Sequence, residues 1–469
     1  MLFHSYTFLT FFSLVLILHG LAPARARRYV LLGASYLFLG WWKWSYTLLL
    51  LAATTIDYAA AKAIDRAQRP RVRGAFLALS MSMNLGMLGL FKYYNFFAHS
   101  LADLLQHKVP LVDLVLPIGI SFYTFESMSY TIDVYRRKTG LARDFVDFAL
   151  FVSFFPRLIA GPIMRAAYFL PQLATARVRT AEQARLGLKT FCFGLFKKMV
   201  VADNLAIFVD AVHRAPATYA TGDLWIAAYA FAFQIYCDFS GYSDMAIGAA
   251  KILGYDLLEN FHRPYCARNV SEFWRRWHIS LSTWLRDYLY ISLGGNRGGP
   301  LRRYANLMIT MLLGGLWHGA NWTFVLWGFL HGSFLVIHRL FASACARVGW
   351  LAKISASRAM TPLFVLLTLH CWVVSMVLFR AENIAKGRRM LGRMFSLAPN
   401  PAGLQVTAYA TLGICVAFYL AQISQERWDF LAGFERLPLP LRTGIIIAGF
   451  YTLVLFTPRE VVPFLYFQF

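Results

Sequence analysis

The stretch Gly314-Gly-Leu-Trp-His-Gly-Ala-Asn-Trp-Thr-Phe-Val-Leu-Trp-Gly328 sets one histidine, His318, among tryptophans, glycines and aliphatic residues. This stretch is hydrophobic enough to lie inside a membrane. An ionisable side chain at that depth costs free energy, and it marks a functional site by default. We therefore predict that His318 belongs to a lipid-shielded site and that the other segments form a scaffold around it. The alternative is a packing histidine that is hydrogen-bonded internally and has no chemical role.

A second unusual block, Ser271-Glu-Phe-Trp-Arg-Arg-Trp-His-Ile-Ser-Leu-Ser282, carries another histidine, His278, upstream of the first. Its tryptophans and arginines form an amphipathic pattern that suits a helix at the membrane interface. We predict that residues 261–300 form an interfacial segment before the His318 stretch. His278 is then either a second residue of the site or simply part of the amphipathic surface.

The composition predicts a membrane protein made of helices. Of the 469 residues 58% are hydrophobic, and the mean hydropathy is +0.51, whereas soluble domains are about 45–50% apolar. Because the apolar residues fall in repeated runs, we expect an all-α polytopic membrane protein, with residues 1–469 forming one integral-membrane domain. The expected number of crossings is about eleven or twelve, with re-entrant and interfacial helices besides.

Hydropathy places the individual spans. We expect them at residues 3–22, 29–42, 44–61, 74–98, 111–132, 188–212, 223–253, 303–320, 321–341, 362–380, 403–422 and 441–457. Residues 99–110 are expected to form an external loop. Between two of the spans, Phe154-Phe-Pro-Arg-Leu-Ile-Ala-Gly-Pro162 holds two prolines and a glycine, which do not support a regular helix. We therefore predict a re-entrant and cytoplasmic segment over residues 145–187.

The charge distribution predicts orientation. The chain has 46 basic and 23 acidic residues and a net charge of +23, and its basic residues cluster in loops. The positive-inside rule puts the loops at 25–28, 62–73 and 136–143 in the cytoplasm and the N-terminus outside. Attraction to anionic lipid is one reason for such loops, and a basic vestibule for a phosphorylated acyl donor is another. Nucleic acid is not expected as a partner, because the basic loops are separated by membrane segments.

Charged residues inside three apolar segments need partners. Glu126 lies in the polar segment 117–135 and is either a paired structural carboxylate or part of a tunnel lining. The pair Lys197-Lys198 is expected to snorkel to an interface. Asp238, with neighbouring serines and glycines, suggests a kinked, internally hydrogen-bonded helix. The six cysteines form no CxxC pair, and we expect neither a metal site nor a permanently bound cofactor.

These residues resemble the membrane-bound O-acyltransferase superfamily, and most closely its bacterial alginate O-acetylation branch. The resemblance rests on Leu-Trp-His318-Gly-Ala-Asn-Trp and Arg-Arg-Trp-His278-Ile-Ser-Leu-Ser. Further matching blocks lie in order along the chain: Pro117-Ile-Gly-Ile-Ser-Phe-Tyr-Thr-Phe, Phe155-Pro through Gly-Pro-Ile163, Cys237-Asp-Phe-Ser-Gly-Tyr-Ser-Asp-Met-Ala-Ile, Asn260-Phe through Pro264-Tyr, Asp287-Tyr-Leu-Tyr-Ile-Ser-Leu-Gly-Gly, Leu378-Phe-Arg-Ala-Glu-Asn and the terminal Tyr-Phe-Gln-Phe469. Two positions depart from the branch: Gln is frequent where Glu126 stands, and the position of Arg157 varies.

The resemblance implies a central tunnel, in which a cytoplasmic acyl thioester such as acetyl-CoA meets an acceptor that comes from the other membrane face. His318 matches the catalytic histidine of the family, and His278 matches its second polar position. A neutral imidazole can remove the proton of an attacking hydroxyl, so we expect His318 to be the general base. Several residues are candidates for the oxyanion donor or a supporting position: Asn321, Trp317, Trp322, His278 and His331. Asp287, beside Arg286, is expected to be an ion-pair partner.

The function expected from these observations is O-acetylation of an exopolysaccharide of the alginate or cellulose type. The protein would work in the bacterial inner membrane, with a periplasmic acetyltransferase as the expected relay partner. One alternative is acyl transfer to another acceptor, as in teichoic acid D-alanylation or the acylation of peptidoglycan or a lipid. A secondary transporter is a further alternative, although the internal repeats common in transporters are not evident here.

Overall fold

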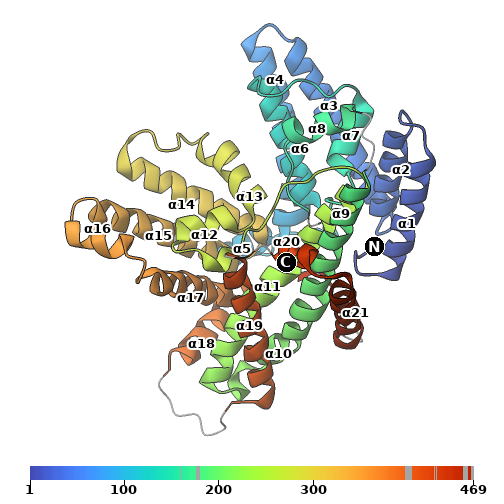
Figure 1. Cartoon of the computed structure of the whole chain (residues 1–469). Coiled ribbons are helices and arrows are strands. Elements are labelled where there is room, and N and C mark those ends of the chain that lie inside the picture. Colours follow the sequence, from blue (N-terminus) through green and yellow to red (C-terminus); the bar gives the residue numbers. More distant parts are fainter. Residues whose placement is uncertain are drawn as a thin grey trace. The chain divides into compact units, whose positions relative to one another are not determined.

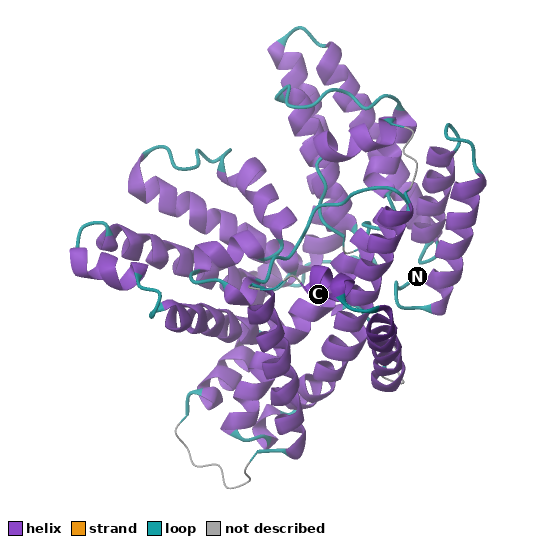
Figure 2. Cartoon of the chain, viewed as in Figure 1, coloured by secondary structure: helices purple, strands orange, loops and turns teal. Residues whose placement is uncertain are grey.

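The structure, a computed structural model, describes residues 1–159, 161–175, 180–396, 404–426, 428, 430–457 and 463–465. Across these residues the chain forms helices and loops and no strand, as Figure 2 shows. The predicted all-α class is therefore confirmed. The terminal Tyr-Phe-Gln-Phe block lies outside the described residues.

The chain forms two compact units. The first consists of Met1–Gly194 with Tyr242–Glu259, and the second of Leu195–Gly241 with Asn260–Phe469. One long helix, α11 (Thr221–Ile252), passes from the second unit into the first and is continuous over its 32 residues. The kink predicted from its serines and glycines stays a prediction. Each unit is described by itself below.

The first unit is built mainly from the helices drawn in blue to green in Figure 1. They are α1 (Tyr6–Leu21), α2 (Arg27–Gly40), α3 (Trp44–Arg66), α4 (Pro70–Leu88), the π-helical η1 (Gly89–Tyr93), α5 (Tyr94–Leu105), α6 (Ile120–Tyr135), α7 (Phe145–Ser153), α8 (Ala166–Ala174) and α9 (Ala181–Leu195). A buried polar cluster ties three of these helices together. On α4, the Ser80 hydroxyl donates a hydrogen bond to Asp57 of α3 at 2.6 Å, and its oxygen lies 3.3 Å from the Thr131 hydroxyl of α6.

The boundaries of two predicted elements in this unit are wrong. The predicted external loop at 99–110 is helical as far as Leu105, and the predicted span at 111–132 is helical only from Ile120. Gly119 explains the late start of α6. Its φ is +75°, and a Cβ there would lie 2.5 Å from the Leu158 carbonyl oxygen, so the chain turns where only glycine fits. Residues 111–119 are not helical.

The predicted break after residue 153 is confirmed. Helix α7 ends at Ser153, α8 begins at Ala166, and residues 154–159 and 161–165 between them are not helical. The stretch 165–187, predicted to be a cytoplasmic connection, contains α8 and the start of α9, and Phe169 and Leu173 of α8 are buried. Because α8 has a buried apolar face, this connection is packed into the first unit.

The second unit contains the remaining helices. They are the π-helical η2 (Phe196–Ala202), α10 (Asp203–Arg214), η3 (Pro216–Thr218), the first part of α11, η4 (Pro264–Cys266), α12 (Val270–Arg276), α13 (Ile279–Trp284), η5 (Leu285–Tyr290), α14 (Gly299–His318), α15 (Trp322–Cys345), α16 (Gly349–Ala356), α17 (Thr361–Arg380), α18 (Ile384–Met394), α19 (Val406–Gln425), α20 (Phe430–Arg436) and α21 (Leu439–Phe456). The predicted spans at 303–320, 321–341 and 362–380 correspond to α14, α15 and α17.

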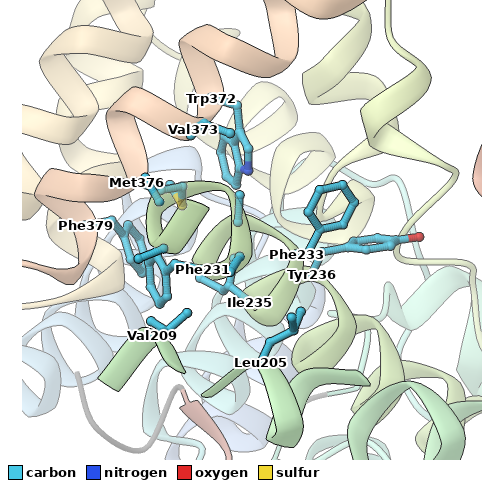
Figure 3. Packing of buried hydrophobic residues seen from close by; sticks show 14 of the residues in the cluster. Leu205, Val209, Phe231, Phe233, Ile235, Tyr236, Trp372, Val373, Met376 and Phe379 are labelled. Atoms are coloured by element: carbon cyan, nitrogen blue, oxygen red, sulfur yellow. The ribbon is translucent and has the colours of Figure 1, made fainter. Parts of the chain in front are cut away.

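The hydrophobic core of the second unit joins α10, α11 and α17. In Figure 3, Leu205 and Val209 of α10 lie below Phe231 and Ile235 of α11, and Met376 of α17 packs from the other side. This core matters for the site because its α17 face continues to Phe379, which contacts His318.

Six helices among the described residues are long and apolar enough to cross a membrane. They are Trp44–Arg66, Pro70–Leu105, Trp322–Cys345, Thr361–Arg380, Val406–Gln425 and Leu439–Phe456. The shorter helix Tyr6–Leu21 is also apolar. The protein is therefore a multi-pass membrane protein, whereas the count of eleven or twelve crossings stays a prediction.

Two sequence predictions about charged residues are wrong in the second unit. Lys198 does not snorkel: it is buried and pairs with Asp203 at 2.6 Å and with Asp238 at 2.8 Å. Asp238 also accepts the backbone N–H of Leu465 at 2.8 Å. Asp238 is therefore part of an ion cluster that holds residues 463–465 against α11, and its bonds are not confined to its own helix.

Candidate active site

The site is built on the antiparallel pair α14 and α15, which lie side by side in Figure 1. Glycines let their backbones approach closely. A Cβ on Gly315 would lie 2.2 Å from the Phe324 carbonyl oxygen, and one on Gly328 would lie 2.3 Å from that of Met311. Small residues permit this spacing in membrane helices. The pair therefore fixes the turn that joins them.

His318 is the last residue of α14, at the start of this turn. Its side chain is buried, with 4% of the residue exposed. Three aromatic rings contact the imidazole: Trp317 and Trp327, each at 5.1 Å between centroids, and Phe379 at 5.4 Å. His318 thus lies in an aromatic surrounding contributed by α14, α15 and α17, away from the outer surface of the unit.

His278 lies between α12 and α13 in a left-handed backbone conformation, with φ +41°. It is fully buried, and the predicted interfacial segment turns inward here, since Trp277 beside it is also buried. The imidazole contacts Phe239 at 4.7 Å and Trp317 at 6.0 Å between ring centroids. His278 lies outside the candidate membrane helices, and burial lowers its pKa to about 3. This histidine is therefore neutral at physiological pH.

Trp317 contacts the rings of both His278 and His318. The two histidines that the sequence predicted for the site therefore both contact the Trp317 indole. A third histidine, His331, is buried on α15 and contacts Trp327 at 4.5 Å between ring centroids. Its Nε2 lies 2.9 Å from the Ser375 hydroxyl of α17. Trp327 thus contacts both His331 and His318, and the supporting role of His331 stays a prediction.

The other candidates differ in their surroundings. The Asn321 oxygen caps α15 by accepting the Thr323 N–H at 3.0 Å, and its amide donates to the Glu382 carbonyl at 2.8 Å. Trp322 is half exposed. Asp287 pairs with Arg286 at 2.7 Å. Among the predicted oxyanion donors, Trp317 contacts the His318 ring.

Glu126 belongs to the first unit, where it forms a buried ion pair with Arg157 and accepts the Met164 backbone N–H at 3.0 Å. Of its two predicted roles, the structure therefore shows the paired carboxylate. The two positions that depart from the branch pattern are partners of one another.

Sequence reasoning missed three neighbours of the histidines: Asn260, Trp327 and Phe379. Trp327 and Phe379 look like ordinary apolar core residues, because nothing in their spacing marks a ring beside His318. Asn260 opens one of the family blocks, Asn260-Phe through Pro264-Tyr, but the proline of this block indicates a loop and drew attention away from the asparagine. No group of three or more metal-ligating side chains occurs in the part of the chain that the structure describes.

A model of the MBOAT, membrane-bound O-acyltransferase family, matches residues 37–379. The chain belongs to this family. The matched range includes both histidines and every ring that contacts them. The protein is therefore an acyltransferase, as the two histidine blocks predicted, and the transporter alternative is set aside.

Its curated relatives include bacterial acetyl-transfer proteins. The chain is 43% identical to the probable alginate O-acetylase AlgI of Pseudomonas aeruginosa, an alignment that covers 89% of this chain and 81% of the relative. It is 39% identical to the protein of the same name from Pseudomonas putida over the whole of both chains. It is 36% identical to the peptidoglycan O-acetyltransferase of Helicobacter pylori, covering 78% of this chain and 73% of that one.

Proposed function

We propose that this MBOAT protein transfers acetyl groups from an acyl thioester for the O-acetylation of an exopolysaccharide, of the alginate or cellulose type. The observation that carries the proposal is the pair of buried histidines, His318 and His278, on either side of Trp317. The whole-length similarity to probable alginate O-acetylases supports the class of acceptor.

In the proposed reaction, His318 takes the proton of an acceptor hydroxyl while the hydroxyl oxygen attacks the thioester carbonyl carbon. The new C–O bond forms, the C–S bond breaks, and the proton returns from the imidazolium to the departing thiolate. The negative charge that develops on the carbonyl oxygen needs a hydrogen-bond donor. We assign this role to the Trp317 indole, because its ring contacts that of His318.

The aromatic surroundings of His318 support the base role physically. Three aromatic rings contact the buried imidazole, and an imidazole in its neutral form can accept the proton of an attacking hydroxyl. The protein would lie in the bacterial inner membrane with its N-terminus outside. The thioester donor, acetyl-CoA or another, would reach the site from the cytoplasm. The acceptor side would be periplasmic, where a partner acetyltransferase would complete the relay to the polymer.

A second candidate acceptor has a specific observation in its favour. The similarity to the peptidoglycan O-acetyltransferase extends over 78% of this chain, so the same site would serve acetyl transfer toward peptidoglycan. Teichoic acid D-alanylation or acylation of a lipid would use the same histidines with a different donor or acceptor.

The test is a chromosomal His318→Gln variant in the host, with ester-linked acetate measured in purified exopolysaccharide and in peptidoglycan. His107→Gln is the matched control, since His107 is exposed on a loop. We expect polysaccharide acetate to fall to background in His318→Gln and to stay at the wild-type level in the control. Full acetylation by a stably expressed His318→Gln protein would overturn the base role. A loss confined to peptidoglycan would reassign the acceptor.

A further inference from the structure

The Asn260 side chain is the centre of a buried hydrogen-bond network around His278. Its Oδ1 lies 3.2 Å from His278 Nδ1. The same oxygen accepts the Ser280 backbone N–H at 3.3 Å and the Ser280 hydroxyl at 2.8 Å. All three residues are almost fully buried. One amide oxygen therefore contacts the His278 ring and both the backbone and the hydroxyl of Ser280.

This network determines which nitrogen of His278 carries the proton. A backbone N–H can only donate, so the Asn260 atom that faces Ser280 must be the carbonyl oxygen and not the amide nitrogen. An amide oxygen has no hydrogen to give, so His278 Nδ1 must be the donor in their contact. In a neutral imidazole the proton then resides on Nδ1, and Nε2 carries a lone pair.

Within the described part of the chain, this unprotonated nitrogen, His278 Nε2, is buried and has no hydrogen-bond partner. The rings that contact the imidazole are Phe239, Phe261 and Trp317, and none of their faces satisfies a lone pair as an N–H or O–H would. Buried polar atoms in proteins are normally paired, so an orphaned acceptor inside a candidate site points to a ligand group.

The backbone supports the same conclusion. His278 has φ +41°, a left-handed conformation that costs free energy for a residue with a Cβ. The conformation persists because the neighbouring Ile279 N–H bonds the Asn260 carbonyl oxygen at 2.9 Å and the Ser280 groups bond its side chain. Asn260 thus holds both the backbone and the ring of His278.

We propose that Asn260 is a positioning residue that keeps the His278 proton on Nδ1, so that Nε2 serves as a hydrogen-bond acceptor for an O–H or N–H group of the bound substrate. The inference rests on the proposed function and deepens it. It removes His278 from the candidates for the oxyanion donor, because a neutral ring in this tautomer has no N–H on its free side. The oxyanion donor must then be another group, such as the Trp317 indole.

The test compares two substitutions of Asn260 in the full-length protein in lipid nanodiscs. Asn260→Asp keeps an acceptor for Nδ1–H and adds a negative charge, which raises the pKa of His278. We expect its acetyl transfer to be within a few-fold of wild type at alkaline pH, with the acid limb of the pH–rate profile moved to higher pH. Asn260→Leu removes the acceptor, and we expect kcat to fall at least tenfold at every pH. Asn383→Asp, at the cap of α18, is the matched control with a wild-type profile.

A second readout needs no turnover. In protein labelled with ¹⁵N-histidine, His278 should give the signal of an unprotonated Nε2 in wild type and in Asn260→Asp above its acid limb, and this signal should change in Asn260→Leu. A wild-type pH profile and kcat in Asn260→Leu, or equal losses in both variants with an unchanged ¹⁵N spectrum, would overturn the inference. Full activity of His318→Gln in the same assay would instead reject the proposed function and leave the tautomer result intact.

Discussion

At the scale of single residues, the two histidines of the site differ in how their environment controls them. His318 lies at the end of a helix with aromatic rings around it, whereas His278 lies on a strained turn with a fixed hydrogen bond on Nδ1. The sequence pointed to His318 because an imidazole in an apolar stretch is costly. It could not point to Asn260, whose bond to His278 joins positions 18 residues apart through a turn that no local pattern specifies.

The buried neutral His278 should make stability depend on pH. Its folded-state pKa of about 3 lies below the unfolded value of about 6.5, so between these values the unfolded chain binds the additional proton. The His278 contribution to stability is complete above pH 6.5 and is lost as the pH falls toward 3. We expect thermal unfolding of nanodisc-embedded protein to shift to lower temperature below pH 6.5, and less steeply in His278→Gln. Identical slopes for the two proteins would argue against a neutral buried imidazole.

At the scale of helices, the sequence located α14, α15 and α17 to within a few residues, because a membrane span must be a long apolar run. It failed where the backbone departs from this rule. The late start of α6 depends on Gly119 and on a carbonyl oxygen from residue 158, and the burial of residues 277 and 278 depends on a left-handed turn. Such features come from tertiary contacts and leave little trace in hydropathy.

A methyl group added between α14 and α15 should lower both the stability and the activity of the protein. Gly315→Ala and Gly328→Ala should each force the helices apart, because each Cβ would lie within 2.3 Å of a carbonyl oxygen on the partner helix. Overpacking of this kind costs about 1–3 kcal/mol, and it would also displace the turn that holds His318. We expect lower thermal stability and a fall in acetyl transfer of at least tenfold.

Gly449→Ala on α21 is the control for these variants, since a Cβ there meets nothing within 4 Å. It should leave both stability and acetyl transfer near wild type. Wild-type activity in Gly328→Ala would mean that the close approach of α14 and α15 does not position the site.

At the scale of the whole molecule, basic residues outnumber acidic ones, but the buried charges described above are balanced by partners. Inside each unit, the buried ions described above are paired: Arg157 with Glu126 in the first, and Lys198 with Asp203 and Asp238 in the second. The sequence showed the overall class, the order of the family blocks and the histidine blocks. It could not show these pairs, because their partners come from different helices, and it did not anticipate the division into two compact units.

The Glu126–Arg157 pair predicts a non-additive result. Removing one partner of a buried ion pair costs about 3–5 kcal/mol, because it leaves an uncompensated charge, whereas replacing both by apolar groups is often nearly neutral. Glu126→Leu and Arg157→Met alone should therefore each lower the unfolding temperature strongly, and the double variant should recover most of the loss. If the double variant is as unstable as the sum of both single variants, Glu126 and Arg157 do not act as a pair.

His318 is central to the proposed reaction, in which it is the general base for acyl transfer. The most direct test of this role is transfer of radiolabelled acetyl from an acyl thioester by purified protein in proteoliposomes, comparing wild type with His318→Gln. We predict a fall in rate of about 10²–10⁴-fold, the usual contribution of a general base, with the unfolding temperature unchanged. A His318→Gln protein that transfers acetyl at the wild-type rate would contradict the account.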